Sequence, residues 1–276
     1  MANETISSGY NDVTFAAWVT SEILDENRPY NVTRPTFRYA GAQASIAYDF
    51  PIQADPGAAT SGYTEGTGLS NTALTTDKAT ATAVANGQMA TVTDEVEETA
   101  VLSVRSQAAK VLGRSVLEEF EVTAMGLVDG FSNTTGTAGV PTTMATLLEA
   151  INQLEQRDQM GTPVGVLDPV QVGDVRLDAA SSGAAILGTG VANDTYNATL
   201  AGFAFNFGGV DWFQSSAVTS TGGGVYLKGV ALGLYEIRPL RVETQRDASL
   251  PGTEIVATSR YGMAEIRDVA GETILI

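Results

Sequence analysis

The longest regular pattern of apolar and polar positions lies between residues 94 and 130. Apolar residues recur there every three or four positions, the spacing of one face of an α-helix. The stripe consists of Val101, Val104, Ala108, Val111, Leu112, Val116, Phe120, Ala124 and Leu127. The acidic segment 94–98 complements the positive end of the helix dipole, and Gly130 ends the pattern. A continuous helix of about 35 residues would be a rod of roughly 50 Å, so we expect a spine along which other elements lie.

Shorter helical patterns flank this segment on both sides. Residues 144–157 have an apolar face and a threonine N-cap, and residues 170–176 predict another short helix. Near the N-terminus, residues 12–27 place Phe15 and Trp18 at helical spacing, and the prolines that follow predict an extended chain. A lone amphipathic helix on an extended arm has little to bury against, so we expect it to dock on another surface.

Strand patterns are concentrated before and after these helices. The predicted strands cover residues 37–40, 44–50, 78–84, 163–169, 203–207, 210–213, 225–234, 240–244, 255–261, 263–267 and 272–276. Gly208-Gly209 and Gly222-Gly223-Gly224 are predicted as turns between strands. The helices and strands alternate without a βαβ rhythm, which predicts an α+β fold.

The segment 37–92 joins its strands through a polar stretch, residues 51–71, rich in Ala, Gly, Thr, Ser and Pro. Two strands with a long polar tip make a poor independent core. One interpretation is a flexible surface loop. The other, which the flanking strands favour, is a projecting hairpin that lies on a neighbouring molecule.

Composition narrows the classes of function. The 276 residues include no Cys and no His, which excludes disulfides, thiolate metal sites, histidine-dependent triads and nearly all zinc enzymes. The net charge of −17 makes the chain a poor general binder of nucleic acid, although a shell around DNA can be acidic because it must not grip the DNA tightly.

The N-terminus does not resemble a secretory signal, and no apolar run is long enough for a membrane span. We therefore expect a protein made in the cytoplasm that stays there unless something else exports it.

No candidate chemistry rises above its ordinary explanation. The glycine clusters lack the spacing of a phosphate-binding loop, and the acidic segment 94–98 lacks the ligand pattern of a calcium loop. The serine pairs 181–182 and 215–216 have no base to activate them. We expect no enzymatic activity, no cofactor and no bound metal.

Positive charge gathers late in the chain, at Arg238, Arg241, Arg246 and Arg260. This is either ordinary surface charge or a set of partners for acidic segments of a neighbouring subunit. The second interpretation, together with the arm and the loop tip, gives a set of candidate inter-subunit contacts. They are Phe15, Trp18, Tyr63, Glu65, Asp94, Glu95, Glu97, Glu98, Arg238, Arg241 and Arg246.

The order of parts resembles the major capsid proteins of tailed phages, which have the Hong Kong 97-type fold: an arm, a long two-stranded loop, a spine helix and a mixed α+β region. Local stretches resemble that family in kind. They are Gly62-Tyr63-Thr64-Glu65-Gly66 at the loop tip, Leu127 to Phe131 with Thr137 to Pro141 after the spine, Val164 to Gln171, Phe207 to Ser215, and Arg260 to Ala264.

The resemblance implies an N-terminal arm (1–36), an extended loop or E-loop (37–92), a peripheral domain (93–141 and 236–276) and an axial domain (142–235). It implies pentamers and hexamers that tile an icosahedral phage head around double-stranded DNA, with a portal, a scaffolding protein and in some cases a decoration protein as partners. No charged helical extension precedes the arm, so we expect a separate scaffold. Lys78 is the only lysine in residues 37–92 and lies on the returning strand, so the loop crosslink of some relatives is not expected.

Three alternatives stay open. An encapsulin nanocompartment would have the same fold and enclose enzyme cargo. A surface-layer protein or adhesin would also fit the acidic, Thr- and Gly-rich composition, although no export signal is visible. A hydrolase that works without histidine is the third.

Overall fold

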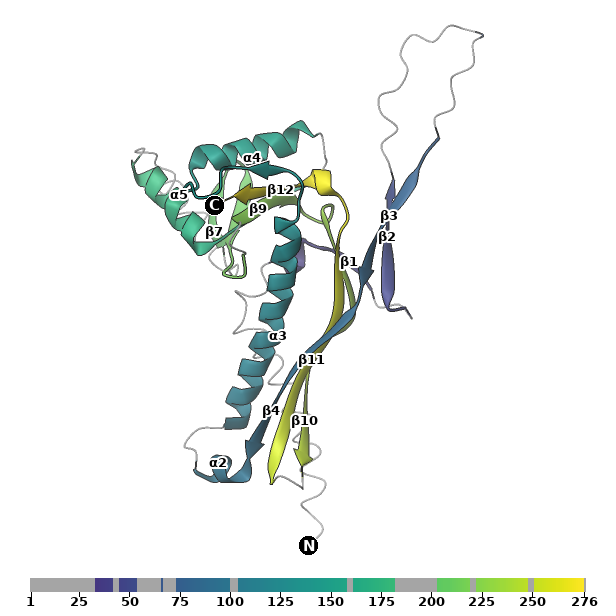
Figure 1. The fold of residues 1–276 in the computed structure, drawn as a ribbon, viewed down its shortest axis with the longest axis vertical. Coiled ribbons are helices and arrows are strands. Elements are labelled where there is room, and N and C mark those ends of the chain that lie inside the picture. Colours follow the sequence, from purple (N-terminus) through teal and green to yellow (C-terminus); the bar gives the residue numbers. More distant parts are fainter. Residues whose placement is uncertain are drawn as a thin grey trace.

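The structure is a computed structural model that describes residues 33–41, 45–53, 66, 73–99, 104–157, 161–181, 203–218, 222–247 and 251–275. A long helix runs beside a long, narrow sheet, a mixed unit of helices and strands lies at one end, and a two-stranded hairpin stands to the side of that unit (Figure 1). In chain order the elements are η2 (Arg34–Thr36), β1 (Arg38–Ala40), β2 (Ala47–Gln53), β3 (Thr76–Thr82), β4 (Val84–Thr93), α2 (Asp94–Thr99), α3 (Val104–Asp129), β5 (Thr134–Thr135), α4 (Met144–Gln156), β6 (Pro163–Leu167), α5 (Pro169–Ser181), β7 (Phe203–Phe207), β8 (Val210–Gln214), β9 (Gly222–Leu227), β10 (Leu232–Asp247), β11 (Gly252–Glu265), η3 (Asp268–Ala270) and β12 (Gly271–Leu275).

The predicted spine is α3, which has 26 residues and is therefore about 39 Å long. The prediction of one continuous helix from residue 94 is corrected, because α2 is a separate element at the lower end of α3 (Figure 1). The buried stripe also differs from the predicted one, since Val111 is exposed and Leu117, Met125 and Val128 are buried.

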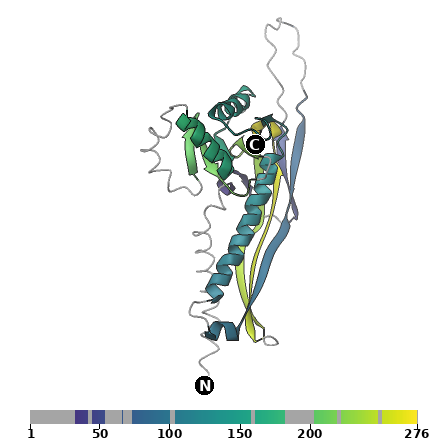
Figure 2. The ribbon, with the colours of Figure 1, turned by 60° about the vertical axis from the view of Figure 1, so that its left-hand side comes forward.

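The spine packs along a four-stranded sheet in the order β1-β10-β11-β4, and the views in Figures 1 and 2 agree on this arrangement. β10 and β11 are antiparallel and form the long centre of the sheet, and β4 pairs with β11 over its whole length. The sequence patterns missed β4 as a strand and divided β10 and β11 into shorter pieces. Val116 and Leu117 of α3 form one core cluster with Val242 and Ile255 of the sheet.

The second described sheet has the order β5-β12-β9-β6-β8-β7, and α4 and α5 lie beside it (Figure 1). Gly208 and Gly209 form the turn between β7 and β8, as predicted, and both have positive φ angles as a two-residue hairpin turn requires. The prediction of a second turn at Gly222-Gly223-Gly224 is wrong. These residues form half of β9, in the interior of the sheet. Glycine is required there because neighbouring backbone and the Val128 side chain leave no room for a Cβ atom.

The projecting hairpin is formed by β2 and β3, which pair in antiparallel register from Ala47 opposite Thr82 to Gln53 opposite Thr76. This confirms a two-stranded structure within the predicted loop. The first strand expected in this loop, residues 37–40, is not part of the hairpin. It forms β1, which pairs in parallel with β10 and belongs to the four-stranded sheet.

Candidate assembly surfaces

The hairpin is held at its root by an apolar cluster shared with the four-stranded sheet. Phe50 of β2 is 1% exposed and packs with Ala81, Tyr235 and Ala264. The Tyr48 ring stacks on the Tyr235 ring with 5.5 Å between centroids. Because the root is packed like a core, the direction in which the hairpin leaves the body is fixed by the chain itself.

The last residues of the predicted arm (1–36) are fixed to the spine and the sheet. The backbone N–H and the Oγ1 hydroxyl of Thr33 donate to the two carboxylate oxygens of Glu121, at 3.0 and 2.8 Å, and both residues are fully buried. Next to it, Arg34 Nη2 pairs with Glu236 at 2.5 Å. These bonds fix Thr33 and Arg34 to α3 and β10.

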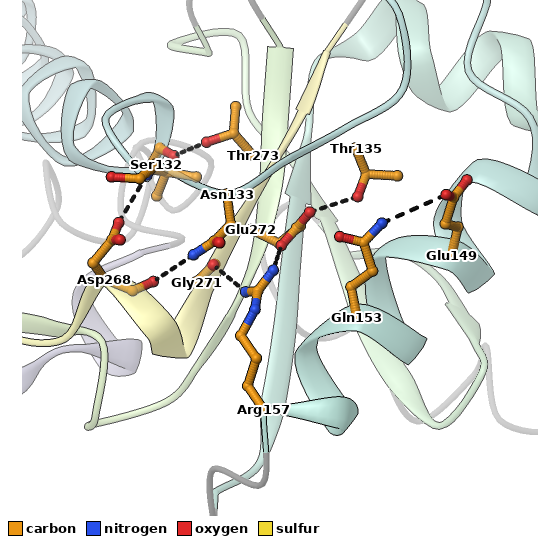
Figure 3. A network of polar contacts seen from close by, with 11 residues as sticks. Ser132, Asn133, Thr135, Glu149, Gln153, Arg157, Asp268, Gly271, Glu272 and Thr273 are labelled. Atoms are coloured by element: carbon orange, nitrogen blue, oxygen red, sulfur yellow. Dashed lines mark hydrogen bonds and ion pairs between the residues drawn. The ribbon is translucent and has the colours of Figure 1, made fainter.

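A polar network joins α4 to the two strands at the edge of the second sheet (Figure 3). The Glu272 carboxylate on β12 is fully buried, where it pairs with Arg157 and accepts a hydrogen bond from Thr135 Oγ1 at 2.6 Å. Arg157 Nη1 also donates to the Gly271 carbonyl at 3.0 Å. A buried carboxylate is tolerated when it is paired and hydrogen-bonded, so this network fixes α4 against β12.

The acidic segment is partly engaged within its own chain. Asp94 accepts hydrogen bonds from both terminal nitrogens of Arg246, at 3.1 and 2.7 Å, and this contact lowers the pKa of Asp94. Glu97 pairs with Arg105 at 2.5 Å. Glu95 and Glu98 are exposed, and neither has a cationic partner within the part of the chain that the structure describes.

The other predicted basic contacts lie on β10. Arg241 pairs with Glu243 of the same strand at 2.5 Å, and both side chains are about half exposed. Arg238 lies opposite Arg260 of β11. Phe15, Trp18, Tyr63 and Glu65 lie outside the described residues. The role of all these residues in inter-subunit contacts stays a prediction.

The sequence patterns missed the three buried carboxylates, Glu121, Glu236 and Glu272. A signal existed for Glu121 alone, because it lies four residues from both Leu117 and Met125 and therefore on the buried stripe of α3. The other two lie on strands at positions where neither pattern nor spacing distinguishes them from surface acids.

The described residues offer no arrangement typical of catalysis. No group of three or more possible metal-ligating side chains occurs among them, and none of their helices has both the length and the apolar character of a membrane span. A shallow groove along α4 is lined mainly by polar side chains. They are Glu149, Asn152, Gln153, Gln156 and Arg157, with Ala145 and Leu148.

Comparison with known proteins gives a result by structure only. No protein-family model and no curated protein matches the sequence. Among solved structures, the capsid protein of cyanophage P-SCSP1u is 15% identical with a TM-score of 0.65, and 88% of this chain and 87% of that one are covered. The capsid of Ralstonia phage GP4 is 10% identical with a TM-score of 0.66, covering 87% and 86%. A virus-like particle from Pyrococcus furiosus is 7% identical with a TM-score of 0.62, covering 94% and 99%.

These likenesses cover most of the chain and most of each neighbour. The chain therefore has the α+β fold of phage capsid proteins, and the expected Hong Kong 97-type architecture is confirmed. At such low identity the likeness establishes the fold, and the function is argued separately below.

Proposed function

We propose that this protein is the major capsid subunit of a tailed-phage-type icosahedral head, assembling as pentamers and hexamers into a shell that encloses double-stranded DNA. The observation that carries the proposal is the projecting hairpin on a capsid fold. Its root is packed into the body, yet most residues of β2 and β3 are exposed or only partly buried, and the two strands stand to the side of the mixed unit (Figure 1). A hairpin beyond its own core gains contacts when it lies on a neighbouring subunit, and such head-to-tail contacts close into rings and shells.

In this proposal residues 1–36 are the arm, 37–92 the extended loop, 93–141 with 236–276 the peripheral domain, and 142–235 the axial domain. The axial domain would meet its copies around five-fold and six-fold axes. Its sheet is completed by β5 and β12, which come from outside residues 142–235. The buried network of Figure 3 would then couple the axial domain to the ends of the peripheral segments.

The role is structural, without catalysis, cofactor or metal. The protein would be made in the host cytoplasm and end in the virion. We expect a separate scaffolding protein, a portal and, in some shells, a decoration protein as partners, and no membrane contact. DNA would be enclosed without sequence-specific binding, since a charge of −17 disfavours phosphate contacts.

A shortened hairpin tests the proposal. Gln53 and Thr76 are register partners, so residues 54–75 can be replaced by Asn-Gly, which closes a two-residue hairpin turn. The root cluster around Phe50 stays intact, so we expect the thermal unfolding temperature to be nearly unchanged. Sedimentation velocity should show shells for the wild type, but only capsomers or monomers for the variant. Shells of the variant in wild-type yield would contradict the role of the hairpin.

A second candidate is a nanocompartment shell of the encapsulin type. It is favoured by the likeness to the Pyrococcus furiosus particle, which spans nearly all of both chains. The contents of particles purified from the native source decide between the two: double-stranded DNA supports the phage head, and an enclosed enzyme supports the nanocompartment.

A further inference from the structure

The two faces of the four-stranded sheet have different surroundings. Strand residues alternate between faces, and the odd-numbered residues of β11 point towards α3. Ile255 and Ala257 share a core cluster with Leu112, and the rings of Tyr261 and Phe120 are 5.0 Å apart at their centroids. The even-numbered residues of β11 and their cross-strand partners therefore lie on the face away from α3, which runs along one side of the sheet in Figure 2.

The upper part of this second face is covered by the hairpin. The Phe50 ring packs against Gly233, and Gly262 has the backbone of Thr82 so close that a Cβ would not fit. The lower part begins at Arg260. Helix α3 packs on the opposite face of this sheet, and α2 contacts β4 at its lower end.

Two arginines lie directly opposite each other at the top of this uncovered area. Arg238 of β10 is the register partner of Arg260 of β11, with register irregularities on both sides of Arg238. Like charges at opposed positions of a sheet destabilise it, and bulges often re-aim a side chain at a functional surface. This pairing therefore costs stability within the single chain.

Neither arginine has a compensating anion among the described residues. No ion pair between described residues involves Arg238 or Arg260, and the glutamates of β10 are engaged, Glu236 with Arg34 and Glu243 with Arg241. The Nε atoms of both arginines are buried without a hydrogen-bond partner. Because their own chain encloses the Nε atoms, a carboxylate of another molecule would bind the terminal nitrogens of these arginines, through charge-assisted hydrogen bonds.

The matching anion is present on the same chain, but too far away to bind there. Glu95 and Glu98 of α2 are exposed and unpaired within the described residues. Arg246, which holds Asp94 at the start of α2, is eight residues further along β10 than Arg238 (246 − 238 = 8). At about 3.3 Å per residue this is roughly 26 Å, beyond the length of any side chain.

We propose that Arg238 and Arg260 form a carboxylate-binding site for Glu95 and Glu98 of a second copy of this chain. The inference rests on the proposed function, because a closed shell supplies every arginine pair with the α2 helix of a neighbour. It explains how copies that each carry a charge of −17 attract one another at one defined place.

A charge-swap experiment tests the site on the full-length protein. The variants are R238E/R260E, E95R/E98R and the combination of all four changes, with R176E on α5 as a single charge-reversal control at an exposed position. Assembly is followed by light scattering and negative-stain microscopy over a range of protein concentrations. Each double reversal should raise the concentration needed for shells by about tenfold or more. The combination of all four changes should bring this concentration back near the wild-type value, and R176E should leave it unchanged.

Each outcome bears on a defined claim. If the wild type forms no shells under any condition tested, the proposed function fails. If it does and R238E/R260E assembles at the same concentration, only the arginine site fails. Failure of the combined variant to restore assembly, or an equal defect in R176E, overturns the pairing with α2. Normal shells that lose only enclosed DNA would assign the arginines to phosphates instead. Should R238E/R260E misfold by circular dichroism, R238Q/R260Q replaces it, with the same expected defect and the same overturning result.

Discussion

Buried carboxylates fix the points at which separate parts of this chain meet. Glu121 holds Thr33 to the spine, Glu236 holds Arg34, and Glu272 holds Arg157 at the end of α4. Removing a partner from such a pair leaves an uncompensated buried charge, so these contacts specify one arrangement more strictly than apolar packing alone. At the scale of single residues, position is therefore defined by polar contacts that hydrophobic patterns do not reveal.

Glu265, at the end of β11, is a carboxylate whose charge destabilises the fold. Burial is the main cause of its raised pKa, and the nearby Asp268 raises the pKa further. A raised pKa in the folded state means that the stability present when the group is protonated is lost as the pH rises through that value. We therefore expect Glu265→Gln to increase the melting temperature at pH 7 and to change it little at pH 4. Calorimetry at both pH values checks this, and an equal effect at both would contradict it.

Single residues also show where sequence reasoning stops. Gly222-Gly223-Gly224 matched a turn by composition, but the cause of the run is a close approach of strands, which depends on residues more than 40 positions away. The apolar spacing of α3 did predict the spine, because its repeat is local. The buried acids were not predictable, since their partners come from distant segments such as Thr33 for Glu121.

At the scale of elements, the spine and the four-stranded sheet pack along each other, whereas the hairpin contacts the body at one end only. The spine and β11 share the core cluster that contains Ile255, whereas the hairpin is anchored only at its root. The polar tip and flanking strands predicted the hairpin. They did not predict that β1 pairs with β10, because parallel pairing between residues almost 200 positions apart has no local signal.

The glycine run of β9 offers a prediction about how tightly its sheet packs. A methyl group at Gly223 would overlap the Val166 carbonyl and the Leu167 backbone, which cannot move without disturbing β6. We expect Gly223→Ala to lower the free energy of unfolding by about 1–3 kcal/mol or to prevent folding. Gly173→Ala, in the open middle of α5, is the matched control and should be neutral or stabilising by roughly 0.5–1 kcal/mol. Chemical denaturation of both variants measures this, and equal stabilities would contradict the packing argument.

At the scale of the whole molecule, surfaces outside the core carry the proposed function. Within the described residues, the hairpin is packed only at its root, the arginine pair on the sheet face away from α3 has no anion, and helix α2 has no cation for two of its glutamates. Each of these features is unfavourable or without purpose in an isolated monomer. Together they describe a subunit that is completed by its neighbours, and many modest contacts repeated over a shell give high overall stability.

Negative-stain electron microscopy of the purified protein, over a range of concentrations and salt, tests this account most directly. The account predicts closed particles of uniform diameter, or rings of five and six subunits that convert to such particles. A protein that stays a uniform monomer at every concentration would contradict it.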